Sequence, residues 1–239
     1  MCIRDRCVGA SAADFLTGWD EVTNSTTTLE SGKQYYLNND VTVSQTITVR
    51  GTVTLDLNGH VLKYESANKG SVIVVENGGQ LTIEDSNTSN LSHKFNPNGK
   101  LWVLDEASGT EAVTGGVITG GTGYPFPLSS GPVNCGGGVY ASGKFQMSGQ
   151  AVIRSCTAEG TSFNCGGGVY VDGSFEMSGE AIIEGCQAIS EYAYGGGVFV
   201  NSSRSFVMSE KAKIEGCQAI STPSSPSKGG GVHLANNTE

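Results

Sequence analysis

The fold is decided by a segment that occurs four times: GGGVYA at 136–141, GGGVYV at 166–171, GGGVFV at 195–200 and GGGVHL at 229–234. The first three occurrences continue through FQMS at 145–148, FEMS at 175–178 and FVMS at 206–209. They end in AVIRSC at 151–156, AIIEGC at 181–186 and AKIEGC at 212–217. The copies begin 30, 29 and 34 residues apart, and the segment after the cysteine varies in length from copy to copy. A repeat of this period is typical of solenoid proteins, in which each copy packs on its neighbours.

Side chains alternate within each copy as they do in a β-strand. Ala151 and Ile153 are matched by small or aliphatic residues in the other copies, whereas Val152 is matched by Lys213. A position that accepts both Val and Lys faces outward, so the strand has one constant and one variable face. We predict three short strands per copy, stacked in parallel about 4.8 Å apart. The expected fold is all-β, a right-handed single-stranded parallel β-helix with one coil per copy.

The rest of the chain is divided around this repeat. Residues 1–12 are expected to be a sequencing-adapter scar, MCIRDR, followed by the remnant of a secretory signal ending in Ala-Ser-Ala. Residues 13–33 are expected to form an N-terminal cap, a short helix or an irregular segment. Residues 34–130 are expected to form irregular coils with loops at 85–100 and 119–132, and residues 131–239 the regular repeats. Because the fourth copy stops early, we expect the chain to be a fragment of a longer protein.

Composition limits the possible partners. The chain has 239 residues, 35 of them glycine, and a formal net charge of −9. Nothing resembles a basic stripe that could neutralise phosphates, so we expect no nucleic-acid partner. No apolar run reaches the length of a membrane-spanning helix.

Several motifs resemble those of a known group of proteins. VTLDLNGH at 53–60, GGQLTI at 78–83 and GGVITG at 115–120 resemble the opening of right-handed β-helix surface proteins, which are large adhesin-like secreted proteins of bacteria. The later repeats are similar to theirs and, more distantly, to polymorphic outer-membrane protein repeats. The resemblance implies a pectin lyase-like fold and an extracellular or cell-surface location. It implies no single activity, because the group carries no shared catalytic motif.

One column of the repeat carries rings that should face outward. It consists of Tyr140, Tyr170, Phe199 and His233, and Phe163, Tyr192 and Tyr194 lie in adjoining loops. Stacked rings form a flat apolar strip with polar tips, to which sugars bind through their apolar faces. The alternative is that the rings merely stack and add stability. We take these residues as candidates for binding glycans or a protein partner.

The cysteines also fall into columns. Cys156, Cys186 and Cys217 occupy one column, and Cys135 and Cys165 another. We expect all of them to be small apolar residues of the interior, with a bond between Cys156 and Cys165 as the exception. Stacked cysteines would have parallel Cα–Cβ bonds, which disfavour a disulfide. No pairing of Cys and His at metal-ligand spacing occurs, so we predict no metal site and no cofactor.

Many right-handed β-helices are enzymes, so we ask whether this chain has the residues that their chemistry needs. A glycosidase needs carboxylates at fixed separation, and a lyase needs acidic calcium ligands beside a basic residue. Asp56, Glu84, Asp85, Asp105 and Asp172 are scattered, whereas Glu184 and Glu215 form a column beside Arg154 that is typical of a solvated face. His60, His93 and His233 are far apart in the sequence, and Asn58-Gly59 is interpreted as a turn. We assign no catalytic residue.

Three functions remain open at this point. The first is a rigid structural or adhesive surface that binds glycans or surface proteins. The second is a carbohydrate-active enzyme, a polysaccharide lyase or a glycosidase. The third is a structural stalk without a ligand.

Overall fold

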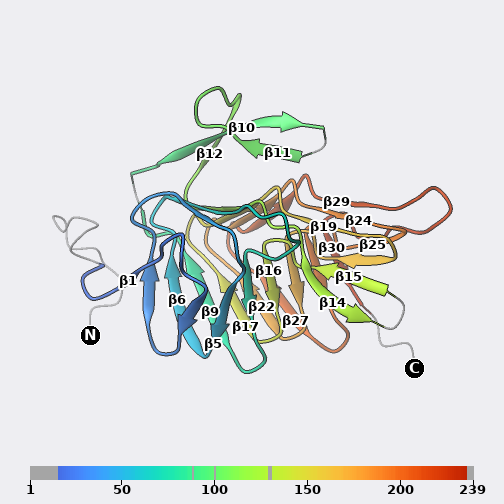
Figure 1. Ribbon diagram of the computed structural model, residues 1–239, viewed down its shortest axis with the longest axis horizontal. Helices are drawn as coiled ribbons and strands as arrows, with labels where there is room; N and C mark the ends of the chain where they lie inside the picture. Colours follow the sequence, from blue (N-terminus) through green and yellow to red (C-terminus); the bar gives the residue numbers. More distant parts are fainter. Residues whose placement is uncertain (1–15, 88, 100, 129–130, 236–239) are drawn as a thin grey trace.

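The computed structural model describes residues 16–87, 89–99, 101–128 and 131–235, and every regular element among them is a β-strand (Figure 1). The first sheet contains β1 (Asp20–Glu21), β3 (Gln34–Tyr36), β6 (Thr52–Asp56), β9 (Gln80–Glu84), β17 (Lys144–Met147), β22 (Ser174–Met177) and β27 (Ser205–Met208). The second sheet contains β2 (Thr28–Glu30), β5 (Ile47–Arg50), β8 (Ile73–Val75), β16 (Val139–Ala141), β21 (Val169–Val171), β26 (Val198–Val200) and β30 (Val232–Leu234). The third sheet contains β4 (Val41–Val43), β7 (Val61–Tyr64), β13 (Val117–Thr119), β18 (Val152–Arg154), β23 (Ile182–Glu184) and β28 (Lys213–Glu215).

Three smaller sheets complete the described part of the chain. The small parallel sheet contains β19 (Thr157–Glu159), β24 (Gln187–Ile189) and β29 (Gln218–Ile220). The mixed sheet contains β14 (Tyr124–Leu128), β15 (Gly131–Cys135), β20 (Phe163–Cys165) and β25 (Tyr192–Tyr194). The antiparallel sheet contains β10 (Ser92–Asn98), β11 (Leu101–Leu104) and β12 (Glu111–Thr114).

The repeated segments take successive positions in the same sheets. Val139, Val169, Val198 and Val232 are register partners in the second sheet. The column Phe145, Phe175 and Phe206 forms in the first sheet, and the column Ile153, Ile183 and Ile214 in the third. Every pairing within these three sheets is parallel. The prediction of parallel strands that pair like residue with like residue is therefore confirmed.

The core lies between the three large sheets and is built from these columns. Phe145 and Phe175 are fully buried, and their rings stack with centroids 4.7 Å apart and an interplanar angle of 8°. Phe206 continues the column at 5.0 Å from Phe175. Register-paired side chains on a parallel sheet lie close enough for such contacts to stabilise the pairing. One cluster of buried residues extends from Val22 to Val200, with Phe206, Ile214 and Val232 packed against it.

The glycines before each repeated valine answer two separate needs. Gly136, Gly166, Gly195 and Gly229 have φ between 60° and 63°, in the left-handed region that L side chains rarely adopt. The next glycine is restricted by space instead, since a Cβ on Gly137 would collide with the carbonyl oxygens of Thr157 and Gly167. Both features explain why glycine recurs at these positions in every copy.

Each copy contains more strands than the sequence indicated. Five strands form between 139 and 165, rather than three, because β19 and β20 follow the cysteine. The N-terminal segment 13–33 contains no helix in its described part; β1 and β2 already pair with the first and second sheets. Both expected loops contain strands: β10 begins within 85–100, and β14 and β15 lie in and beside 119–132. The scar and signal remnant at 1–12 lie outside the described residues.

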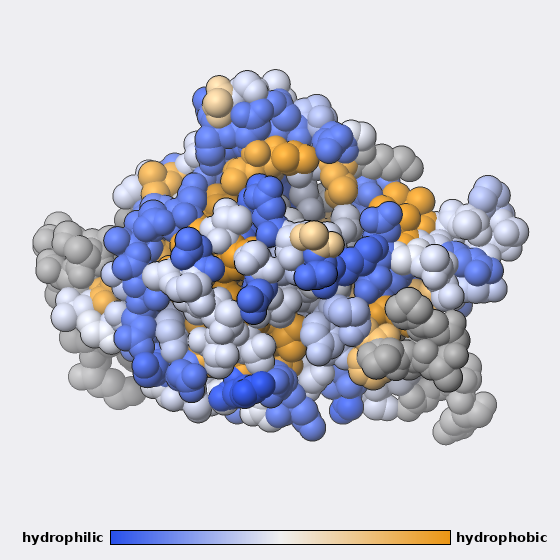
Figure 2. Space-filling view, in the orientation of Figure 1, coloured by the Kyte–Doolittle hydropathy of each residue, from blue (hydrophilic) through white to orange (hydrophobic). Residues whose placement is uncertain are grey.

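The antiparallel sheet covers part of the third sheet. In Figure 1, β10, β11 and β12 form a lobe set apart from the parallel strands. Phe95 of β10 is fully buried and packs with Val61, Val117 and Val152, whose side chains point out of the third sheet. In Figure 2, apolar atoms gather in a band beneath this lobe, whose own surface is mostly hydrophilic. The lobe therefore covers the outer face of the third sheet and forms a second hydrophobic cluster with it.

None of the described residues forms a helix with the length and apolar character that a bilayer crossing requires.

Candidate functional site

The predicted aromatic column forms in the second sheet. The rings of Tyr140 and Tyr170 stack with centroids 4.7 Å apart, and Tyr170 and Phe199 with centroids 5.6 Å apart. His233 continues the column at 5.4 Å from Phe199. The column points away from the central core, as the alternation of side chains predicted.

Most of this column is nevertheless covered. Tyr140 and Phe199 are only 8% and 6% exposed, because the mixed sheet packs over them with Val133 and Cys165. Burial raises the pKa of both Tyr140 and Tyr170 above the ordinary value for tyrosine. The expectation of an open strip along the whole column is wrong, since the sequence did not reveal that the mixed sheet lies over this face.

The accessible rings lie on the mixed sheet and at the last strand of the second sheet. Tyr192 is 40% exposed, and Tyr194 and His233 are half-buried. Tyr194 stacks on His233 with centroids 5.1 Å apart, and Phe163 tilts against Tyr194 at 5.2 Å. The ammonium group of Lys228 lies 5.6 Å from the Tyr194 ring centroid. We call Phe163, Tyr192, Tyr194 and His233 the aromatic edge.

The cysteines differ from the prediction in two respects: the bond between Cys156 and Cys165 is absent, and a stacked pair, which was expected not to bond, forms a disulfide. Cys135 and Cys165 form a disulfide, with Cα atoms 4.8 Å apart. They are register partners on β15 and β20, and both strands end there in a glycine turn, so the distance falls in the range a disulfide needs. The predicted bond between Cys156 and Cys165 is wrong, because Cys156 lies in the central core and Cys165 beneath the mixed sheet. Cys156, Cys186 and Cys217 are free thiols, and the first two are buried.

Arg154 is buried rather than solvated. Its side chain is 2% exposed, and its guanidinium contacts Glu111 at 2.7 Å and Glu184 at 2.6 Å. The rings of Phe95 and Trp102 lie 4.8 and 5.0 Å from the guanidinium carbon. The antiparallel sheet supplies Glu111 and both rings, so this environment exists only when the lobe is folded. Comparison of the repeated segments could not reveal it, because the lobe lies outside them.

A groove of about 260 Å³ opens beside Arg154 and is also lined by Gln150, Glu180 and Glu184. Its carboxylates have cationic partners: Glu184 pairs with Arg154, and Glu180 with Lys211 at 2.7 Å. The groove is polar, but the carboxylates of Glu180 and Glu184, which could act as general acid or base, are engaged in these ion pairs.

Asp56 and Asp85 are buried carboxylates that hold backbone turns. Asp56 accepts hydrogen bonds from the backbone N–H groups of Asn58 and Ser86, and Asp85 from those of Gly59 and Gly116. Burial raises the pKa of Asp85, and these N–H groups act in the opposite direction. Asn58 has φ of 48°, as expected for the predicted Asn-Gly turn.

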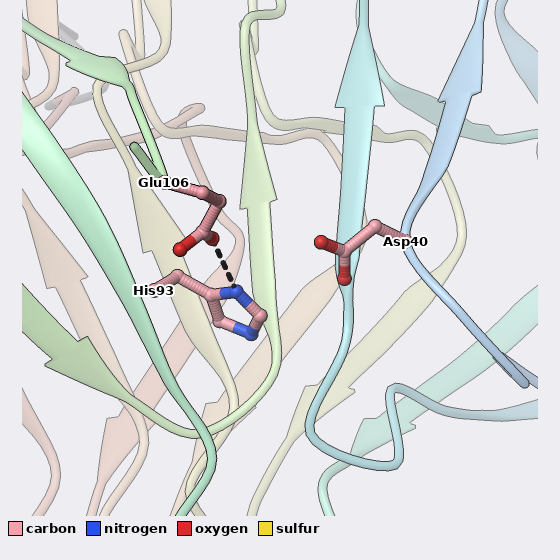
Figure 3. A group of neighbouring side chains, drawn as sticks. All are labelled: Asp40, His93 and Glu106. Carbon is pink, nitrogen blue, oxygen red and sulfur yellow. Dashed lines mark hydrogen bonds and ion pairs between the residues drawn. The ribbon is translucent and has the colours of Figure 1, made fainter. Parts of the chain in front are cut away.

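Three side chains from distant parts of the sequence meet where the lobe joins the parallel strands (Figure 3). Asp40 precedes β4, His93 belongs to β10, and Glu106 follows β11. One ligand-type atom from each lies within 4.8 Å of the other two. His93 Nδ1 is 2.8 Å from Glu106 Oε1, and its Nε2 is 2.7 Å from the carbonyl oxygen of Gly59. The sequence spacing of these residues gave no signal of this group, and the lobe alone brings them together.

Comparison of the chain with family models, curated proteins and solved structures gave no match.

Proposed function

We propose that this chain is a right-handed parallel β-helix that acts as a rigid structural or adhesive surface and binds glycans through its aromatic edge. The in-register columns that pair Val with Val and Phe with Phe across successive copies support the β-helical architecture. Such stacking pairs the backbone of each copy with that of the next, which favours an elongated and stiff body. A secreted or cell-surface location belongs to the same proposal, and the disulfide between Cys135 and Cys165 fits an oxidising compartment.

The observation that carries glycan binding is the grouping of accessible rings on the mixed sheet. Tyr192 and Tyr194 lie on β25, and His233 lies on β30 of the second sheet and stacks on Tyr194. All three side chains leave surface open to solvent. Aromatic faces with polar tips suit sugars, whose rings have apolar faces bordered by hydroxyl groups. Tyr140 and Phe199 support the edge from beneath and take no direct part in the proposed contact.

The test compares glycan binding of the wild-type chain with that of a Tyr192→Ser, Tyr194→Ser double variant. A glycan array identifies ligands, and calorimetry measures their affinity. We expect the double variant to lose at least tenfold in affinity while its melting temperature changes little. Val103→Ser is the matched control, because Val103 is 44% exposed but lies on the antiparallel sheet.

Three results would count against the proposal: no glycan bound by the wild type, equal affinity in the double variant, or an equal loss in the control. Turnover of a polysaccharide on the same array would instead favour the carbohydrate-active enzyme. The groove beside Arg154 would then be the place to examine.

A further inference from the structure

We propose that Asp40, His93 and Glu106 form a binding site for a divalent transition-metal cation such as Zn²⁺, which fastens the antiparallel sheet to the parallel strands. The site is independent of glycan binding, because it lies at the lobe and shares no residue with the aromatic edge.

The orientation of His93 is the first step of the argument. Its Nε2 is 2.7 Å from the backbone carbonyl of Gly59, which can only accept, so Nε2 carries the hydrogen. Nδ1 then faces Glu106 Oε1 at 2.8 Å, a contact that needs a hydrogen between the two atoms, and a bound cation would take the place of that hydrogen. The ring itself is only 8% exposed. A histidine that binds a metal through one nitrogen usually donates the other N–H to a carbonyl or carboxylate. For His93 that carbonyl belongs to Gly59, which is not one of the three proposed ligands.

The two carboxylates are held in a similar way. Asp40 Oδ1 accepts from the backbone N–H of Val61 at 2.9 Å, and Glu106 Oε2 from that of Lys94 at 3.2 Å. His60 lies 3.5 Å from Asp40 and is placed to hold this carboxylate. Each of the three groups is thus oriented by an atom outside the cluster, which is how ligands of metal sites are commonly fixed.

The convergence of these groups calls for a cation. Two carboxylates and one imidazole nitrogen gather within 4.8 Å, and Figure 3 shows both carboxylates directed toward the ring. One nitrogen and two oxygen ligands suit Zn²⁺, whose bonds of about 2.0–2.2 Å separate tetrahedral ligands by roughly 3.3–3.5 Å. Small rotations reach this spacing, because the side chains of Asp40 and Glu106 are both 45% exposed and can adjust. Their exposure also gives the ion a path from solvent.

The position of the site indicates a structural role. Asp40 belongs to the connection from β3 to β4, whereas His93 and Glu106 belong to the lobe. A metal bound to all three would cross-link the lobe to the connection that leads into β4, a strand of the third sheet. We therefore expect metal to protect the lobe from local opening.

The test measures binding of ZnCl₂ by calorimetry to the full chain after treatment with a chelator. We expect one Zn²⁺ per chain, and an affinity at least tenfold weaker in Glu106→Gln and in Asp40→Asn. Glu106 is half-exposed, so its variant should fold, whereas His93→Gln removes a buried ring and needs a melting curve beside it. Glu191→Gln and His233→Asn are controls for an exposed carboxylate and an unrelated histidine, and both should bind as the wild type does. His60→Asn should weaken binding less than Glu106→Gln.

A second readout follows the lobe itself. Limited proteolysis should cut within residues 86–114 more slowly when Zn²⁺ is present, and Glu106→Gln should abolish this protection. The proposal is overturned if the wild type shows no saturable Zn²⁺ binding, or if Glu106→Gln and Asp40→Asn bind as tightly as the wild type. A His93 ring that carries hydrogen on both nitrogens in the presence of excess Zn²⁺, seen by NMR, would also overturn it.

Discussion

Arg154 illustrates how one residue changes its role when the chain folds. It shares a column with Glu184 and Glu215, which in the sequence is typical of a solvated ladder of charges. In the structure the lobe covers it, and two carboxylates and two rings surround the guanidinium. Removing one partner of a buried ion pair leaves the others desolvated and uncompensated, which is the costly case.

We therefore expect Arg154→Ala to lower the free energy of unfolding by about 3–5 kcal/mol. Arg204→Ala is the matched control, because Arg204 is 45% exposed in its pair with Asp172 and such pairs contribute about 1 kcal/mol or less. Urea unfolding followed by circular dichroism measures both. Equal losses in the two variants would show that Arg154 is not a buried anchor.

Tyr140 and Tyr170 provide a pH-dependent prediction. Burial raises the pKa of both phenols above the ordinary value of 10.0, so the folded state keeps its protons where the unfolded state loses them. Their contribution to stability is complete below pH 10 and is lost as the pH rises through the folded-state pKa. We expect stability to fall above about pH 10, and Tyr140→Phe, Tyr170→Phe to flatten this fall. Denaturant unfolding from pH 8 to pH 11.5 measures it, and an unchanged slope in the double variant would refute the assignment.

At the scale of elements, the sequence predicted the strands whose side chains alternate. Val139–Ala141, Lys144–Met147 and Val152–Arg154 all form where the constant face indicated. It did not predict β19 and β24, because Thr157, Ala158 and Gln187 carry no apolar alternation and pair through their backbones with neighbouring copies. The lobe was missed because a polar, asparagine-rich segment is typical of a loop, and its buried apolar residues Phe95 and Val113 lie far apart in the sequence. Two residues of the metal-site candidate lie in that lobe, so the site could not be predicted from the sequence.

The disulfide between β15 and β20 should stabilise the mixed sheet and the copies that it links. It closes a separation of 30 residues, for which chain entropy suggests a stabilisation of about 3–4 kcal/mol. We expect Cys135→Ser to lower the free energy of unfolding by this amount and to make it insensitive to dithiothreitol. Cys217→Ser is the control and should keep the sensitivity of the wild type, because Cys217 is a free thiol. A wild type whose unfolding does not respond to the reductant would contradict the prediction.

At the scale of the whole molecule, successive copies contact mainly their neighbours. The register partners of 169–171 are 139–141 on one side and 198–200 on the other, and the first and third sheets follow the same order. In such an arrangement stability is close to a sum over copies and the contacts between adjacent copies. The architecture should therefore tolerate the loss of a complete copy, provided that the columns remain in register.

Deleting residues 166–194 examines this directly. Cys165 and Tyr194 are register partners, so the deletion joins equivalent positions and brings Tyr140 onto Phe199, Phe145 onto Phe206 and Ile153 onto Ile214. We expect a folded, β-rich protein that is less stable than the wild type and about 4.8 Å shorter along the stacking direction. Circular dichroism and small-angle scattering measure these properties.

Deleting residues 166–180 is the control: it removes β21 and β22 but keeps β23, so the second and first sheets lose a strand while the third sheet does not. This breaks the register of the columns and should unfold the C-terminal copies. If both deletions unfold the protein equally, the copies do not stack as interchangeable units and the β-helix proposal fails.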